Sequence, residues 1–173
     1  MAISLSIVGY FSFSPYKNVK ENGFSFKYPK ELNIVELGRG HTNKNTTNYI
    51  YYQIRNSEIE GRGGSVIQVT IPIKYILNEK YQRTLTSYLE ASGNSEFIPL
   101  IKDININGHE GEIAEYRIDR QLPGDRPVHA NYSDIYLESP YINAPVHLQY
   151  YQQDTDLHSL DEAWEMVLES IDY

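Results

Sequence analysis

Residues 97–118 read FIPLIKDININGHEGEIAEYRI, and this stretch decides which kind of fold the chain adopts. Two runs with the composition of strands, 97–106 and 112–118, stand on either side of Asn107-Gly108. Asn-Gly favours a type I′ turn because both residues tolerate a positive φ, and that turn matches the twist of paired antiparallel strands. The stretch therefore predicts a β-hairpin and, with it, an antiparallel sheet.

Six further segments have the patterns of strands. Phe24–Tyr28 alternates apolar and polar residues and stops at Pro29, which cannot donate a hydrogen bond to a strand ladder. Val66–Ile71 is dense in β-branched residues. The other predicted strands are 32–37, 49–54, 132–137 and 146–151. Residues typical of turns fill the segments between them, which predicts loops over 38–48, 56–64, 119–128 and 138–145.

Two segments follow the helical period instead. Apolar side chains recur at helical spacing in the first, which predicts a helix over 78–91. Ser159 and Glu162 have the spacing of a capping box, which predicts the start of a second helix over 159–171. Each helix has one apolar face, which must be covered. We therefore expect an α/β fold, an α/β/α sandwich in which helices flank a central antiparallel sheet.

Length and composition narrow the classes of function. A chain of 173 residues suits one domain and buries enough surface to fold without a disulfide or a metal. The formal net charge of -8 argues against nucleic acid as a partner, because phosphate backbones call for a basic surface. The most concentrated basic residues are a scattered group near the N-terminus, Lys17, Lys20, Lys27 and Lys30. The absence of cysteine excludes disulfides, thiolate catalysis and iron–sulfur clusters.

The N-terminal segment bears on location. Residues 2–13 are apolar or small, carry no charge and are too short to span a membrane. They are typical of the end of a signal-peptide core or a removed anchor, although a first strand of the domain is the alternative. We expect residues 1–22 to be such a remnant plus a linker, and residues 23–173 to form a single domain. This predicts an extracytoplasmic protein, secreted or tethered, with a cytoplasmic location as the alternative.

The order of these motifs resembles the Mog1/PsbP-like family. The resemblance rests on the opening GFSFKYP at 23–29, the strand at 66–71 followed by a helix, the hairpin around Asn107-Gly108, and the LESI ending at 168–171. It implies a central antiparallel sheet flanked by helices. It also implies a lipoprotein-like binding or assembly factor rather than an enzyme.

Few residues offer chemistry for catalysis or metal binding. Among the five histidines, only His109-Glu110 suggests an ion site, and a turn is an ordinary place for such residues. Ser133-Asp134 has no neighbouring histidine of the kind a triad needs. His147, Gln149 and Tyr151 share one face of their predicted strand, which is simplest as a solvated polar face.

Two short motifs also favour structural roles. Asp154-Thr155-Asp156 begins like a calcium loop but lacks the later glycine and glutamate, so we expect a turn before the helix. Gly61–Gly64 lacks the lysine of a phosphate loop and precedes a strand rather than a helix. We therefore predict no catalytic, cofactor-binding or metal-binding residue, no cofactor and no enzymatic activity. Asn45 and Asn131 lie in N-glycosylation sequons.

Three functions remain after these exclusions. The leading hypothesis is a non-enzymatic extracytoplasmic module that binds a protein partner, and the second is a cytoplasmic adaptor. The third is an enzyme or a carrier that holds a small ligand between tyrosines, although packing within a sheet explains many tyrosines as well. The tyrosines of such a pocket would be Tyr49, Tyr51, Tyr52, Tyr132, Tyr136, Tyr150 and Tyr151.

Overall fold

The structure, a computed structural model, describes residues 14–41, 48–56, 64–74, 84–91, 99–120, 128–139, 144–154 and 159–173. These residues form nine strands and two helices. In chain order they are β1 (Tyr16–Glu21), β2 (Phe24–Pro29), β3 (Asn33–His41), β4 (Asn48–Arg55), β5 (Val66–Lys74), α1 (Leu85–Ala91), β6 (Ile101–Ile106), β7 (His109–Arg120), β8 (Val128–Leu137), β9 (Val146–Gln153) and α2 (Asp161–Glu169).

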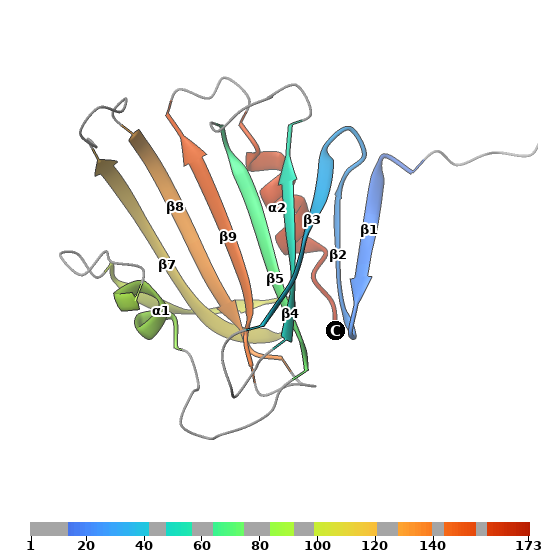
Figure 1. The fold of residues 1–173 in the computed structure, drawn as a ribbon, viewed down its shortest axis with the longest axis horizontal. Helices are drawn as coiled ribbons and strands as arrows, with labels where there is room; N and C mark the ends of the chain where they lie inside the picture. The colour runs from blue at the N-terminus through green and yellow to red at the C-terminus, as the bar shows by residue number, and fades with distance from the viewer. Residues whose placement is uncertain are drawn as a thin grey trace, which may run out of the picture.

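The described part of the chain is mostly β-structure, so the expected α/β/α sandwich is wrong. Seven strands form one antiparallel sheet in the order β3-β4-β5-β9-β8-β7-β6, and β1 and β2 form a separate hairpin (Figure 1). Within the described residues the two helices have 7 and 9 residues, which is too little to form a layer on each side of so wide a sheet. The hairpin β1–β2 and α2 share the covering of one face.

Most predicted strands are present, but their limits differ from the prediction. The linker expected before Gly23 contains β1, which pairs with β2 through a turn at Asn22 (φ 50) and Gly23 (φ 87). Asn22-Gly23 is a hairpin signal of the same kind as Asn107-Gly108. β3 also continues to His41, into the predicted loop, past a bulge between Glu36 and Gly38.

The hairpin predicted at Asn107-Gly108 is confirmed. The two residues have φ values of 53 and 90, and β6 pairs with β7 from Ile106 and His109 outward. The turn also binds α2, because the Asn107 Nδ2 group donates to the carbonyls of Leu168, Glu169 and Ile171 at 3.0–3.2 Å. The carbonyls of Leu168 and Glu169 lie in the last turn of α2, where helix carbonyls lack their usual partners within the helix.

α2 covers one face of the sheet together with the β1–β2 hairpin. Its apolar residues pack on an aliphatic and aromatic core, and a bridge between Ser25 and Asp172 ties the C-terminus to β2. The predicted capping box does not form. The Tyr150 hydroxyl on β9 accepts from the Leu160 backbone N–H at 3.2 Å and donates to Asp161 Oδ1 at 2.8 Å, while the Ser159 hydroxyl accepts from the Asp161 backbone N–H at 3.1 Å. A neighbouring strand and Ser159 therefore satisfy the helix start together.

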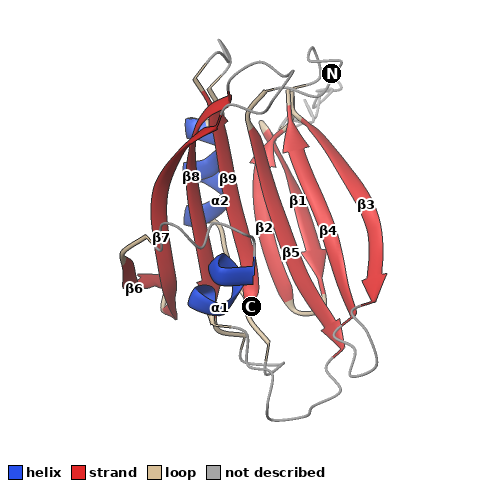
Figure 2. Ribbon diagram, turned by 60° about the vertical axis from the view of Figure 1, so that its left-hand side comes forward, coloured by secondary structure: helices blue, strands red, loops and turns tan. Residues whose placement is uncertain are grey.

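α1 lies on the opposite face of the sheet (Figure 2). It corresponds to the C-terminal half of the helix predicted over 78–91, whose first six residues lie outside the described part of the chain. Leu85 and Leu89 pack on Ala114 and Tyr136, and the Leu85 backbone N–H donates to Glu112 Oε2 at 3.1 Å. The sheet therefore has one face covered by α2 and the hairpin, and another on which α1 rests.

Candidate functional site: a tyrosine-rich sheet face

The face of the sheet that carries α1 is polar across its middle. Residues paired across a sheet point to the same side, and the register aligns Gln53 on β4 with Gln68 on β5, Gln149 on β9 and Asp134 on β8. Three glutamines thus form a row that ends at a carboxylate. The other face of the same strands carries aliphatic residues such as Ile67, Val69 and Leu148, which are buried.

Tyrosines flank this row on both sides. One neighbouring row contains Tyr51, Thr70, His147 and Tyr136, and the other contains Val66, Tyr151, Tyr132 and Tyr116. We call these twelve residues of the three rows the tyrosine-rich face. Its members are Tyr51, Gln53, Val66, Gln68, Thr70, Tyr116, Tyr132, Asp134, Tyr136, His147, Gln149 and Tyr151.

The ring contacts fix several of these tyrosines against one another. The rings of Tyr116 and Tyr132 stack with centroids 5.1 Å apart and planes inclined by 4°, and Tyr151 lies 5.1 Å from Tyr132. On the other side of the glutamine row, the ring centroids of Tyr49 and Tyr51 lie 5.0 Å apart. Aromatic pairs in such arrangements gain about 0.5–1.5 kcal/mol beyond the area they bury. The rings therefore present a partly ordered surface.

The pocket lining predicted from tyrosines is wrong for two of its seven members. Tyr51, Tyr132, Tyr136 and Tyr151 do belong to the tyrosine-rich face, and Tyr49 lies on the same side of the sheet in contact with Tyr51. Tyr52 and Tyr150 point to the other side, where Tyr52 contacts Phe26 and Tyr150 contacts Trp164. Successive residues of a strand alternate between faces, so adjacent tyrosines cannot line one surface.

Asp134 is the centre of the site. Its side chain is 0% exposed, and three donors from neighbouring strands reach its two oxygens. His147 Nε2 and the Gln149 amide lie 2.7 and 2.8 Å from Oδ1, and the Tyr116 hydroxyl donates to Oδ2 at 2.7 Å. A carboxylate in this position accepts from all three groups, so Asp134 sets the orientation of side chains on β7 and β9.

α1 completes the burial of this network. The Tyr88 ring of α1 lies 4.6 Å from the His147 ring, and Tyr136 contacts the same imidazole at 4.8 Å. Burial, together with the nearby Asp134 carboxylate, raises the pKa of Tyr88 to about 12 and holds the pKa of Tyr116 well above its ordinary value. Both phenols therefore stay protonated, and the Tyr116 hydroxyl remains a donor to Asp134.

Sequence reasoning missed the contact between Asp134 and His147. It sought a histidine near Ser133-Asp134 along the chain, whereas β8 and β9 bring His147 to the carboxylate across the sheet. The alternation in both strands was visible, and a hairpin between them would have placed both residues on one face. The solvated face predicted for His147 is also wrong, because His147 is 8% exposed.

The other residues singled out in the sequence lie apart from this site. The His109 ring contacts Tyr173 at 4.4 Å, and Asp154 pairs with Arg117. Within the residues that the structure describes, no three histidine or carboxylate side chains gather as a metal site would require. Asn131 is exposed on β8, while Asn45, Asp156 and Gly61–Gly63 lie outside the described residues, as does His158.

Comparisons with known proteins identified no relative of this chain. We found no match for this chain among protein-family models, curated proteins or solved structures. The resemblance to the Mog1/PsbP-like family therefore stays a prediction. Among the described residues, neither helix has the length and apolar character needed to cross a bilayer.

The donors to Asp134 can be tested one at a time. Tyr116→Phe removes one donor and leaves a buried carboxylate oxygen unsatisfied, which costs about 2 kcal/mol of unfolding free energy. Tyr151→Phe, on the same face, is the matched control, and we expect it to change stability by less than about 0.5 kcal/mol. Urea unfolding measures both. Equal stability of the two variants would contradict the assigned role of Asp134.

The raised tyrosine pKa values predict a loss of stability in alkali. Tyr88 ionises near 10.0 in an unfolded chain and near 12 in the folded one, so its stabilising contribution is complete below pH 10 and disappears as the pH rises to about 12. Burial and the bond to Asp161 likewise raise the pKa of Tyr150 to about 12. Urea unfolding across this range should record a falling free energy, with a shallower fall for Tyr88→Phe. Stability that stays constant to pH 12 would contradict the burial of both phenols.

Proposed function

We propose that this protein is a non-enzymatic binding module and that the tyrosine-rich face is the surface that contacts its partner. The observation that carries the proposal is the row of three glutamines that ends at the buried Asp134, between two rows rich in tyrosine. Half-buried tyrosines and amides occupy this middle part of a sheet whose other face forms a core.

The chemistry of this face favours recognition over catalysis. Both Asp134 oxygens are engaged by donors of the protein itself, so the carboxylate acts as a fixed acceptor within the fold. The Thr70 hydroxyl, in the position opposite His147, has no hydrogen-bond partner among the described residues and is therefore not activated by the imidazole as a nucleophile would be. Glutamine side chains both donate and accept, which suits a partner with backbone or side-chain amides.

A protein partner fits this surface better than a small ligand. The tyrosine-rich face extends over β4, β5, β9, β8 and β7, and tyrosine gives large contact areas at a small loss of conformational entropy. Tyrosine is also enriched in protein–protein interfaces, whereas lysine and glutamate are depleted there. α1 packs on Ala114 of β7 and Tyr136 of β8, and in Figure 2 it stands in front of the lower parts of β8 and β9. The contact would therefore centre on β5 and on the rest of β9.

The location of the protein stays a prediction. The uncharged segment 2–13 supports an extracytoplasmic module, secreted or tethered, and a cytoplasmic adaptor is the alternative. The proposed surface is the same in either compartment, because it depends only on β4, β5, β9, β8 and β7.

Site-specific photo-crosslinking in cells of the source organism tests the proposal. A photoreactive residue replaces Gln68 on the tyrosine-rich face or, as a control, the exposed Glu115 on the opposite face. We expect a discrete protein adduct from position 68 only. Tyr51→Ala should abolish this adduct, while Tyr16→Ala on the hairpin should leave it unchanged. Adducts of equal yield from both positions, or none from position 68, would overturn the proposal.

A further inference from the structure

The β1–β2 hairpin differs in charge from the rest of the chain. Residues 15–30 contain four of the eight lysines and a single acidic residue, Glu21. The remainder contains eleven basic and twenty-two acidic residues, so a basic segment stands against a strongly acidic protein. The sequence alone left these lysines scattered, but the pairing of β1 with β2 gathers them on one two-stranded element.

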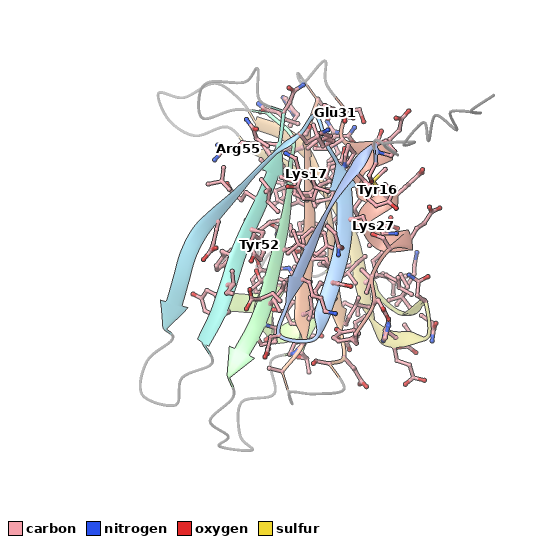
Figure 3. The ribbon with its side chains drawn as sticks, turned by 90° about the vertical axis from the view of Figure 1, so that its right-hand side faces the viewer. Tyr16, Lys17, Lys27, Glu31, Tyr52 and Arg55 are labelled. Atoms are coloured by element: carbon pink, nitrogen blue, oxygen red, sulfur yellow. The ribbon has the colours of Figure 1, made fainter. Side chains whose placement is uncertain are left out.

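The lysine side chains of this hairpin lie on both of its faces. Lys17 pairs with Tyr28 and its Nζ lies 5.7 Å from that ring, whereas Lys27 pairs with Asn18 and its Nζ lies 4.6 Å from the Tyr16 ring. Adjacent pairs of a hairpin alternate between faces, so the two ammonium groups lie on opposite faces. Figure 3 shows Tyr16 and Lys27 together on the hairpin, with Lys17 apart from them.

The acidic end of the protein lies on the other side of β2. Ser25 of β2 forms a bridge with Asp172, and the Ser170 hydroxyl accepts from the Lys27 backbone N–H at 2.7 Å. The C-terminal segment therefore follows one edge of β2 while β1 occupies the other. As a result, β1 is the strand through which a negatively charged surface can approach with the least repulsion from the C-terminal carboxylates.

Two features favour a lipid surface over an acidic protein as the partner of the hairpin. Tyr16 is 38% exposed at the start of β1, and tyrosine is enriched where proteins meet lipid headgroups. The twelve residues 2–13, which enter β1 through Ser14 and Pro15, carry no charged side chain. Lysines next to an uncharged apolar segment are the pattern that binds anionic lipids, at about 1 kcal/mol for each lysine near the surface.

We propose that the β1–β2 hairpin docks edge-on against an anionic lipid bilayer, with Lys17, Lys20 and Lys27 at the headgroups and Tyr16 at the interface. The long lysine side chains reach the headgroups from both faces of the hairpin. This orientation is independent of the proposed partner surface, because the tyrosine-rich face belongs to the seven-stranded sheet and the hairpin packs on the opposite face of that sheet.

Vesicle co-sedimentation of the full chain tests the proposal. The vesicles consist of phosphatidylcholine alone or of an equimolar mixture with phosphatidylglycerol. We expect binding to the mixed vesicles that weakens as salt rises. The triple variant Lys17→Gln, Lys20→Gln, Lys27→Gln should lower the partition coefficient at least about tenfold. The control, Lys44→Gln, Lys80→Gln, Lys102→Gln, removes the same charge and should bind like the wild type.

Three results would overturn the proposal. The first is an absence of binding to the mixed vesicles. The second is equal binding to both kinds of vesicle, which would assign the affinity to apolar residues alone. The third is an equal loss in the two triple variants, which would assign it to net charge. Circular dichroism of each variant confirms that a change in binding does not come from unfolding.

Discussion

The pairing of β5 with β9 is the contact on which the rest of the structure depends. It joins Val66–Thr70 to His147–Tyr151, about eighty residues further along the chain, and unites β3-β4-β5 with β9-β8-β7-β6 in one sheet. On one face it brings Gln68 to Gln149 and Thr70 to His147. On the other it places Ile67 and Val69 beside Leu148 and Tyr150, where α2 packs. A single register therefore sets both the core and the polar site.

The two faces of the sheet are stabilised by different physics. The face under α2 and the hairpin gains its stability from apolar burial, and it contains Phe24 and Phe26 besides the aliphatic residues. The tyrosine-rich face buries a carboxylate, which is unfavourable unless donors compensate for the lost water. Tyr116, His147 and Gln149 supply these donors from β7 and β9. We infer that the buried Asp134 carboxylate, although unfavourable by itself, holds the side chains of this face in one arrangement through its three donors.

The sequence predicted what depends on local pattern. The turn at Asn107-Gly108, the alternation of Phe24–Tyr28 and the apolar stripe of α2 all produce their elements where expected. The prediction failed where a contact comes from residues that are distant in sequence. Asn107 caps the end of α2, and Tyr150 together with Ser159, instead of the box of Ser159 and Glu162, satisfies its start. Neither contact follows from spacing, because each needs the position of another strand.

Dependence on distant strands also explains why the α/β/α sandwich was wrongly predicted and why the polar site around Asp134 was missed. Nothing in the pattern of Val66–Ile71 says that β9 rather than β6 lies beside it, and without that neighbour Gln68 and Gln149 cannot be placed in one row. The sandwich was expected because two amphipathic helices were predicted. The helices do exist on opposite faces, but the β1–β2 hairpin, whose first strand lies in the predicted linker, covers much of one face.

Engineered cysteine pairs test the β5–β9 register most directly, because the chain has no cysteine of its own. Directly opposed residues have Cα atoms within the range of a disulfide, whereas diagonal ones lie about 7–8 Å apart. We expect Gln68→Cys with Gln149→Cys to oxidise to a disulfide in the folded protein and Thr70→Cys with Gln149→Cys to remain reduced. A disulfide only in the second pair, or in neither, would contradict the register and the site built on it.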